Sequence, residues 1–184
     1  MPASNSYCAF VADKPLDEVN RYYHDHDYGF PIESDDELFG RLILEINQAG
    51  LSWNTILVKQ DNFRKAYSNF SIAKIAAYKE KQRQRLLNDA GIIRNRLKVD
   101  AAIHNANVIK GLQKEFGSFK DWLDHNHPLN KDEWVKLFKK TFKFTGGEIT
   151  GEFLMSSGYL AGAHSDDCPT YKKILKKKPA WIKS

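Results

Sequence analysis

One acidic residue, Glu45, has a setting in which a carboxylate could act on a bound ligand. A capping-box pattern predicts that a helix begins at Asp35, and Gly50 ends it. Apolar residues recur in this helix at three- and four-residue spacing, and Glu45 points from their stripe. Trp53 follows within reach of the carboxylate. Such a buried acid is costly unless a charged or hydrogen-bonding partner meets it, so the pattern indicates a binding site. The alternative is an ordinary helix glutamate whose stem packs while its head reaches water.

Two cysteines and two histidines are of the types that hold a structural metal ion. His164 and Cys168 lie four positions apart, so both could reach one ion from a single turn. With Cys8 and His24 they would form a tetrahedral Cys2His2 zinc site that joins the two ends of the chain. Two inert thiols remain an alternative, and a disulfide between cysteines 160 positions apart has little support. Competing metal ligands are available nearby: Asp25, His26, Asp166 and Asp167.

Residues 81–106 form a predicted helical hairpin with basic flanks. A polar helix ends at Asn88, residues 89–91 turn the chain, and a new helix begins near Asn95. We expect Gly91 to adopt a positive φ in the turn, and the N–H groups of the following helix start to hold a phosphate. The alternative is an ordinary hairpin whose basic face is solvated. The basic residues are Lys81, Arg83, Arg85, Arg94, Arg96 and Lys98.

The net charge of +5 is unevenly distributed along the 184 residues. Residues 1–50 contain 3 Lys or Arg and 10 Asp or Glu, whereas residues 51–184 contain 25 and 13. A basic majority beside an acidic segment suits a protein with one face toward a polyanion. Solvated lysines on helix surfaces produce similar totals, so the charge alone does not identify the partner.

Composition and pattern restrict the class of protein. A hydrophobic content of 42% with four Trp indicates a folded chain and argues against disorder. No apolar run is long enough to span a bilayer and the N-terminus lacks a signal-peptide core, so we expect a soluble, cytoplasmic protein. No alternating strand pattern, repeat or linker is present, which predicts one all-α domain over residues 1–184. We expect this domain to act as a monomer, although no sequence feature determines the oligomeric state. Residues 171–184 form a basic tail, interrupted by Pro179.

Local signals place several further elements. A short helix is expected from about Leu16 to Tyr23, and another from about Ile149 to Tyr159. Ser71 and Ser118 are each expected to cap the helix that follows.

The segment that carries Glu45 also carries a family resemblance. Glu45 followed by residues 47–53, Asn-Gln-Ala-Gly-Leu-Ser-Trp, resembles the signature of the bacterial 3-methyladenine DNA glycosylase I family. The order of motifs agrees from Tyr7 to about Cys168, which is roughly nine-tenths of the chain. The resemblance implies an all-helical helix-hairpin-helix glycosylase fold with a structural zinc on Cys8, His24, His164 and Cys168.

The same resemblance implies the activity and the roles of the residues. The expected reaction is hydrolysis of the N-glycosidic bond of 3-methyladenine in alkylated double-stranded DNA, with free 3-methyladenine as product. Glu45, the expected catalytic residue, would act mainly by accepting hydrogen bonds from the base, which is cationic while attached to DNA, and activation of water is its alternative role. Aromatic faces would be offered to this flat cation by Trp53, Tyr23, Phe10 and Tyr28. DNA phosphates would be held by the hairpin residues Gly91, Arg94, Asn95 and Arg96.

The chain departs from the family pattern mainly in its last third. Residues 147–152 read Gly-Glu-Ile-Thr-Gly-Glu where the family shows a hydroxyl- and tyrosine-containing helix, and residues 160–163 also differ. Two rival functions therefore stay open. One is a zinc-stapled DNA-binding module without activity, and the other is a glycosylase with a different range of alkylpurines. The sequence offers no candidate for the catalytic Asp of other helix-hairpin-helix glycosylases.

Overall fold

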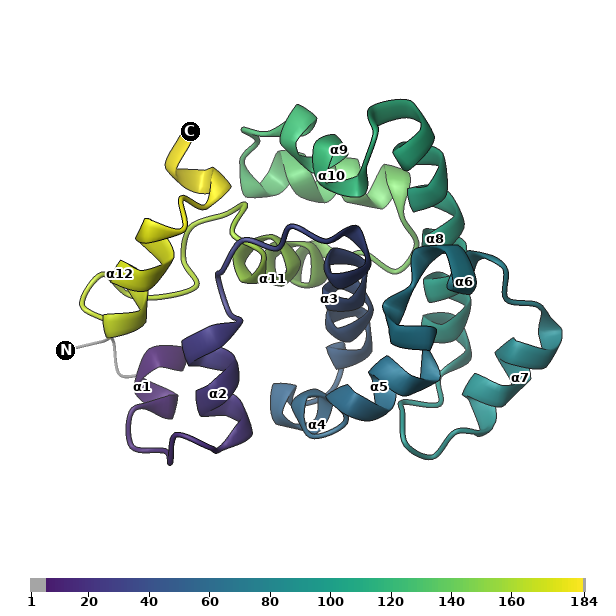
Figure 1. Ribbon diagram of the computed structural model, residues 1–184, viewed down its shortest axis with the longest axis horizontal. Helices are drawn as coiled ribbons and strands as arrows, with labels where there is room; N and C mark the ends of the chain where they lie inside the picture. The colour runs from purple at the N-terminus through teal and green to yellow at the C-terminus, as the bar shows by residue number, and fades with distance from the viewer. Residues whose placement is uncertain (1–5, 184) are drawn as a thin grey trace.

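The fold is built from helices, and no strand occurs among residues 6–183, which are the residues described in this computed structural model (Figure 1). Residues 1–5 and 184 of the predicted domain and tail lie outside this range. No helix in the described part of the chain is long and apolar enough to cross a membrane. The elements are α1 (Tyr7–Val11), α2 (Val19–His26), α3 (Asp35–Gln48), α4 (Trp53–Leu57), α5 (Gln60–Ala66), η1 (Ser68–Phe70), α6 (Ile72–Ala76), α7 (Glu80–Asn88), α8 (Arg96–Phe116), α9 (Phe119–Asn126), α10 (Lys131–Thr141), α11 (Gly147–Ser156), α12 (Pro169–Lys176) and η2 (Ala180–Lys183).

Helix α3 lies at the centre of the fold, with other helices around it (Figure 1). It begins at Asp35 as predicted, because the Ser34 hydroxyl accepts a hydrogen bond from the Glu37 backbone N–H. The Glu37 side chain does not complete the capping box; it forms two 2.7 Å hydrogen bonds with Arg64 instead. Residues 38–47 are all buried, so α3 packs around its whole circumference. A helix buried in this way is rigid and can hold side chains in a defined position.

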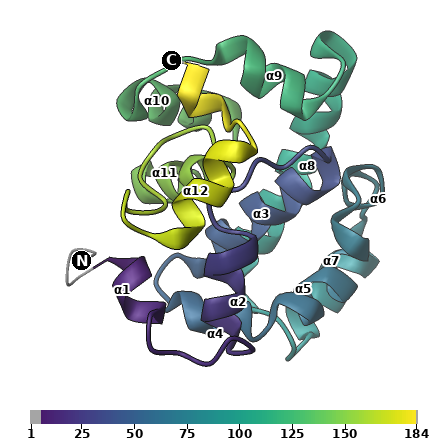
Figure 2. The same cartoon turned by 60° about the vertical axis from the view of Figure 1, so that its left-hand side comes forward.

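Three groups of helices surround α3. Helices α5 to α8 pack on one side, and α8 continues into α9, α10 and α11, which cover another. Helices α1 and α2 form the third group, and α12 lies beside them in both views although it is far away in the sequence (Figures 1 and 2). The N-terminal and C-terminal segments are therefore neighbours, as the predicted metal site requires.

Two predicted helices have different boundaries in the structure. The helix expected from Leu16 to Tyr23 is α2, which begins only at Val19. Its start is set by Glu18, whose carboxylate accepts hydrogen bonds from the N–H groups of Asn20 and Arg21, while Leu16 is exposed in the preceding loop. The helix expected from Ile149 to Tyr159 is α11, which starts and ends two to three residues earlier. Both errors concern ends, where local capping decides and periodicity carries little information.

The two predicted serine caps have different outcomes. Ser118 caps α9 as expected, since its hydroxyl accepts a 2.8 Å hydrogen bond from the Asp121 N–H. Ser71 occupies the capping position of α6 but makes no such bond. The Ile72 N–H donates instead to the carboxylate of Asp36, at 2.9 Å. A side chain from α3 has replaced the local cap.

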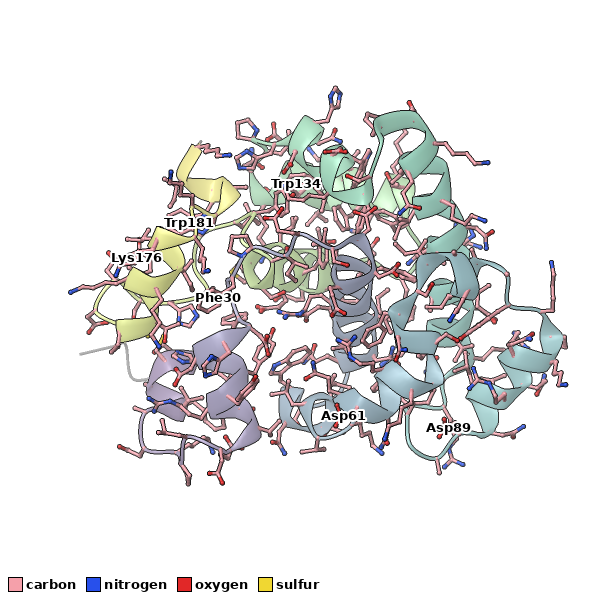
Figure 3. All side chains as sticks on the ribbon, viewed as in Figure 1. Phe30, Asp61, Asp89, Trp134, Lys176 and Trp181 are labelled. Carbon is pink, nitrogen blue, oxygen red and sulfur yellow. The ribbon has the colours of Figure 1, made fainter. Side chains whose placement is uncertain are left out.

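The basic tail is folded onto the protein. Helix α12 begins at Pro169 and buries Ile174, while the lysine side chains on its outer face, such as Lys176, are exposed (Figure 3). Trp181 stacks on Tyr171 with ring centroids 6.1 Å apart, and the backbone N–H of Trp181 donates to the Gly158 carbonyl. The bond to Gly158 fixes the end of the tail against the segment that follows α11.

Candidate functional site

A cavity of about 710 Å³ opens between α2, α3, α4 and the start of α11. Four aromatic side chains and three glutamates line its walls, and among the described residues no Lys or Arg does. A concave, mostly apolar site with a few polar groups is typical of a pocket for a flat organic ligand. The lining residues are Tyr7, Tyr23, Tyr28, Glu45, Gln48, Ala49, Gly50, Trp53, Gly146, Gly147, Glu148, Ile149 and Glu152.

Glu45 is the most deeply buried acid of the cavity, with 4% of its surface exposed. Within the described residues its carboxylate has one hydrogen bond, a long one of 3.4 Å from the Ser156 hydroxyl. Burial raises the pKa of Glu45 to about 8, and the neighbouring Glu152 adds to the rise while Arg41 opposes it. A nearly unpartnered buried carboxylate is costly for the fold, and a ligand that donates hydrogen bonds to it would offset this cost.

Three of the four predicted aromatic residues line the cavity together. The Tyr23 ring lies 5.1 Å from that of Trp53 and 5.6 Å from that of Tyr28, measured between centroids. Phe10 does not line it: its side chain is 55% exposed and stacks on the outer face of Tyr7, at 6.0 Å. The aromatic wall is completed by Tyr7, which the sequence did not single out. Helix α1 is only five residues long, so its periodicity could not show which ring faces inward.

Arg41 holds the Tyr23 ring of this wall in place, and the sequence analysis did not identify it. Its guanidinium donates a 2.8 Å hydrogen bond to the Tyr23 hydroxyl and a 3.3 Å bond to the Ser156 carbonyl, and it lies 4.9 Å from the Tyr23 ring centroid. It stands one turn before Glu45 on α3, and 9% of it is exposed. A single arginine inside an apolar helix is the signal by which it could have been found.

Glu152 is a second carboxylate in the cavity, placed there by α11. The Tyr28 hydroxyl donates a 3.1 Å hydrogen bond to its Oε2 atom. Burial raises the pKa of Glu152 above its ordinary value. The sequence marked residues 147–152 as a departure from the family pattern without indicating that both of its acids, Glu148 and Glu152, line the pocket.

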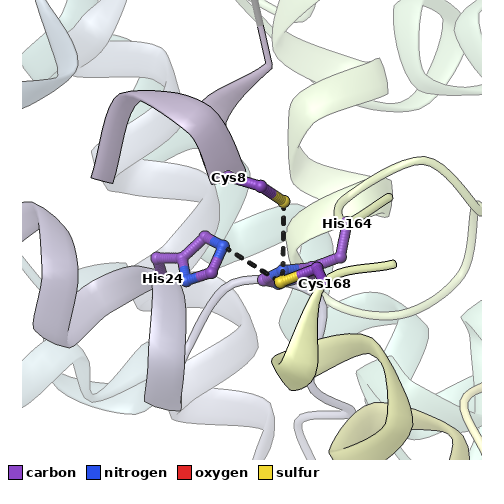
Figure 4. Close-up of side chains that lie close together, drawn as sticks. All are labelled: Cys8, His24, His164 and Cys168. Carbon is purple, nitrogen blue, oxygen red and sulfur yellow. Dashed lines mark hydrogen bonds between the residues drawn. The ribbon is translucent and has the colours of Figure 1, made fainter. Parts of the chain in front are cut away.

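Cys8, His24, His164 and Cys168 converge at one point between α1, α2 and the start of α12 (Figure 4). The ligand atoms of these four buried residues lie within 4.8 Å of one another, and both thiols are free. The Sγ atom of Cys168 lies 3.5 Å from His164 Nδ1 and 3.7 Å from His24 Nε2, and Cys8 Sγ lies 3.7 Å from His164 Nδ1. Sulfur and nitrogen atoms that ligate one zinc ion tetrahedrally are separated by about 3.6 Å. The spacing therefore fits a tetrahedral metal ion.

The second nitrogen of each histidine is oriented by a neighbouring group. His24 Nδ1 lies 2.7 Å from the Asp25 carboxylate, and His164 Nε2 lies 2.8 Å from the backbone carbonyl of Tyr28. Partners of this kind fix the tautomer and ring orientation of metal-ligating histidines. Tyr28 therefore connects the two sites, because its backbone carbonyl contacts His164 of the cluster and its side chain lines the cavity.

The predicted hairpin is present between α7 and α8, with Asp89 at its turn (Figure 3). Asn95 caps α8, because its side-chain oxygen accepts a 3.2 Å hydrogen bond from the Lys98 N–H. The predicted positive φ at Gly91 is wrong, since its φ lies outside the left-handed region. The turn is closed instead by the Asp89 carboxylate, which accepts a 2.8 Å bond from the Gly91 N–H. Glycine suits the position because a Cβ there would lie 3.3 Å from Asn62.

Only part of the basic cluster near the hairpin faces solvent freely. Arg94 and Arg96 are exposed on either side of the capping Asn95. Arg83 is paired with Asp100, and Arg85 donates to the Ala66 carbonyl. Lys98 is buried, with 5% of it exposed. The hairpin therefore presents two arginines beside a helix N-terminus, which is a geometry suited to phosphate.

The described residues form an all-helical protein with an aromatic and acidic pocket, and comparison with known sequences identifies its family. Residues 12–134 match the family described as methyladenine glycosylase, and the chain belongs to this family. The resemblance stated from the sequence is thereby confirmed.

Individual relatives agree with this assignment. The chain is 35% identical to DNA-3-methyladenine glycosylase 1 of Escherichia coli (strain K12), over 89% of this chain and 96% of that protein. It superposes with a TM-score of 0.77 on 3-methyladenine DNA glycosylase I from Staphylococcus aureus, at 30% identity over 89% of this chain and 95% of that one. A variant of such an enzyme solved in complex with 3-methyladenine superposes with a TM-score of 0.78, at 30% identity over 89% and 96% of the two chains.

Proposed function

We propose that this protein is a DNA repair glycosylase that hydrolyses the N-glycosidic bond of 3-methyladenine in alkylated double-stranded DNA. The observation that carries the proposal is Glu45, a buried carboxylate with one long hydrogen bond, in a cavity walled by aromatic rings. Relatives and solved structures of 3-methyladenine DNA glycosylases support it at 30–35% identity. The products are free 3-methyladenine and an abasic site.

The residue types suit the chemistry of the lesion. Methylation at N3 makes the attached adenine a flat cation, which aromatic faces and a carboxylate both attract. An unmodified adenine is neutral, so the same pocket holds it less well. The lesion also pairs poorly, which lowers the cost of flipping it out of the stack. The rings of Tyr23 and Trp53 lie 5.1 Å apart and supply the aromatic contact.

The positive charge of the base also activates it as a leaving group. The C1′–N9 bond breaks and its electron pair neutralises the departing base, while water adds to C1′ and releases one proton to solvent. Because the leaving group needs little further activation, Glu45 acts mainly in recognition, by accepting hydrogen bonds from the edge of the base. Burial raises the pKa of Glu45, and the positive charge of the bound base lowers it again and so favours the ionised form that accepts these bonds. Its position among apolar groups, away from bulk water, strengthens those bonds.

DNA docks through the hairpin in this proposal, which makes the fold a helix-hairpin-helix glycosylase. Arg94 and Arg96 neutralise phosphates, and the N-terminus of α8 at Asn95 adds N–H donors and the positive end of a helix dipole. Gly91 has no side chain, so the backbone of the turn can approach the DNA strand closely. Contacts of this type position the enzyme without reading the sequence.

Zinc is the ion we assign to the Cys2His2 cluster. The two sulfur and two nitrogen donors match its preferred ligands, and their spacing fits a tetrahedron. No position in the set of four ligands is left open for water, so the role is structural. The ion joins α1 and α2 to the segment before α12, and through His164 it holds the backbone of Tyr28 at the pocket.

The test is the release of free bases from methylated duplex DNA. Wild-type protein should release 3-methyladenine, and Glu45→Gln should do so about 10- to 150-fold more slowly through the loss of a charge-assisted hydrogen bond. Trp53→Ala should lose about 1–3 kcal/mol of base stacking. Glu115→Gln, on the surface of α8, is the matched control and should behave as wild type.

Two results would contradict the proposal in different ways. If Glu45→Gln released the base at the wild-type rate, Glu45 would be an ordinary helix glutamate and the pocket would lie elsewhere. If the wild type bound DNA but released no base, the protein would be a DNA-binding module.

A further inference from the structure

Two carboxylates of α11 line the pocket besides Glu45: Glu148, which is exposed, and Glu152, which is half-buried. Glu45 enters from α3 and Glu152 from α11, so the two acids approach a ligand from different walls. They are close enough that the charge of Glu152 raises the pKa of Glu45. The Oε2 atom of Glu152 is held by the Tyr28 hydroxyl at 3.1 Å. A carboxylate oxygen has two lone pairs, so this bond leaves Glu152 able to accept from a ligand as well.

The positive charges around Glu152 are engaged elsewhere. Arg41 stands behind the wall, bonded to the Tyr23 hydroxyl and the Ser156 carbonyl. Lys131, which acts on Glu152 only through its charge, is paired at 3.8 Å with the exposed Glu148. Tyr28 is the one hydrogen-bond donor that Glu152 meets among the described residues. The cavity therefore attracts cations from two sides.

The hydrogen-bond donors on the edge of an alkylated base determine whether it can bind to both Glu45 and Glu152. An adenine edge carries one exocyclic amino group, and Glu45 accepts a hydrogen bond from it. A guanine edge carries the N1–H and the N2 amino group side by side, and a carboxylate can accept two parallel hydrogen bonds from such a pair. Methylation at N7 makes guanine a flat cation while it is attached to DNA, as methylation at N3 does for adenine.

We propose that Glu152 is a specificity-determining residue that extends the substrate class of this pocket to cationic alkylguanines, of which 7-methylguanine is an example. The inference rests on the proposed glycosylase function and adds a second class of substrate to it. Glu152 accepts hydrogen bonds from the N1 and N2 edge of the guanine, while Tyr28 holds the carboxylate in place. Neutral purines lack the charge that both acids require.

The experiment measures two bases released from one substrate. Duplex DNA treated with a methylating agent carries both 3-methyladenine and 7-methylguanine, and chromatography separates the released bases. Wild-type protein should release both. Glu152→Gln removes a charge that both cationic bases feel, so release of both should fall, and release of 7-methylguanine should fall at least tenfold more than that of 3-methyladenine. Glu115→Gln should change neither, and Tyr28→Phe should lower 7-methylguanine release more than 3-methyladenine release.

A measurement on the wild type alone guards against a variant that does not fold. The nucleoside 7-methylguanosine is cationic like the lesion and should inhibit release of 3-methyladenine, whereas unmodified guanosine should not. The inference is overturned if the wild type releases 3-methyladenine without 7-methylguanine, or if Glu152→Gln lowers both equally, since Glu152 would then only position Tyr28. If the wild type released neither base, the proposed function itself would fail.

Discussion

Lys98 reaches across the protein to Asn47: its Nζ donates a 2.8 Å hydrogen bond to the Asn47 carbonyl and a 2.7 Å bond to the Ala49 carbonyl. Lys98 lies in the first turn of α8, just after the hairpin, and Asn47 lies in the last turn of α3, just after Glu45. A cation at this place satisfies carbonyls that have no partner within the helix and complements the negative end of the α3 dipole. One ammonium thus joins the proposed DNA-binding hairpin to the wall of the pocket.

Replacing Lys98 with Met keeps the length of the side chain and removes both bonds. Bonds to a charged group contribute about 1.5–3 kcal/mol, so Lys98→Met should lower the free energy of unfolding by that amount. Urea denaturation measures it. Lys110→Met, at an exposed position of the same helix, should change it little. An equal stability of the two variants would show that Lys98 does not hold the end of α3.

The buried Glu45 makes stability depend on pH. Its pKa is about 8 in the folded protein and about 4.5 in the unfolded chain. Between these values the folded state binds a proton that the unfolded state has lost, so the unfolding free energy decreases as pH rises through this range. Glu45→Gln removes this term and should be more stable than the wild type at pH 8, by on the order of a few kcal/mol. At pH 4 the two should be alike.

Thermal melting at a series of pH values checks this expectation. Glu115→Gln is the control, because the exposed Glu115 should change stability at neither pH. A wild type and a Glu45→Gln variant with parallel pH profiles would mean that Glu45 is ionised and solvated across the whole range.

Cys168→Ser tests the zinc assignment. Purified wild-type protein should carry about one zinc per chain. The variant should lose metal and melt at a lower temperature, because a structural zinc contributes folding free energy directly. Metal analysis and melting with and without a chelator measure both effects. The assignment would be disproved if the purified wild type contained no metal and a chelator left its melting temperature unchanged. A disulfide between Cys8 and Cys168 would also disprove it.

Arg94 and Arg96 test the DNA-binding role of the hairpin. Changing both to Ala should weaken binding to damaged and undamaged duplex alike and reduce the slope of log K against log salt by about 1–2. Lys139→Ala with Lys140→Ala, an equal loss of charge on the exposed face of α10, is the control and should leave the slope unchanged. If the double variant weakened binding to damaged DNA alone, the two arginines would contact the lesion and not the phosphate backbone.

The sequence by itself determined the features that depend on neighbours within one or two turns. The start of α3 at Asp35, the cap of α9 at Ser118 and the cap of α8 near Asn95 were predictable because the atoms involved are within three residues of each other. The residue types made Cys8, His24, His164 and Cys168 candidates for a metal site among competing ligands, and the family resemblance implied this particular set. The position of Glu45 within an apolar stripe followed from helical periodicity alone.

Tertiary structure decided which side chains share the pocket. Tyr28 meets Glu152 across 124 positions of sequence, and Tyr7 lines the cavity while Phe10, one turn later, faces solvent. Lys98 counted as a surface charge in the sequence and is buried because α3 ends beside it. Such contacts depend on how helices pack against each other, and side-chain type and spacing do not encode that packing locally. The same is true of the second carboxylate, whose function depends on the wall that α11 places opposite α3.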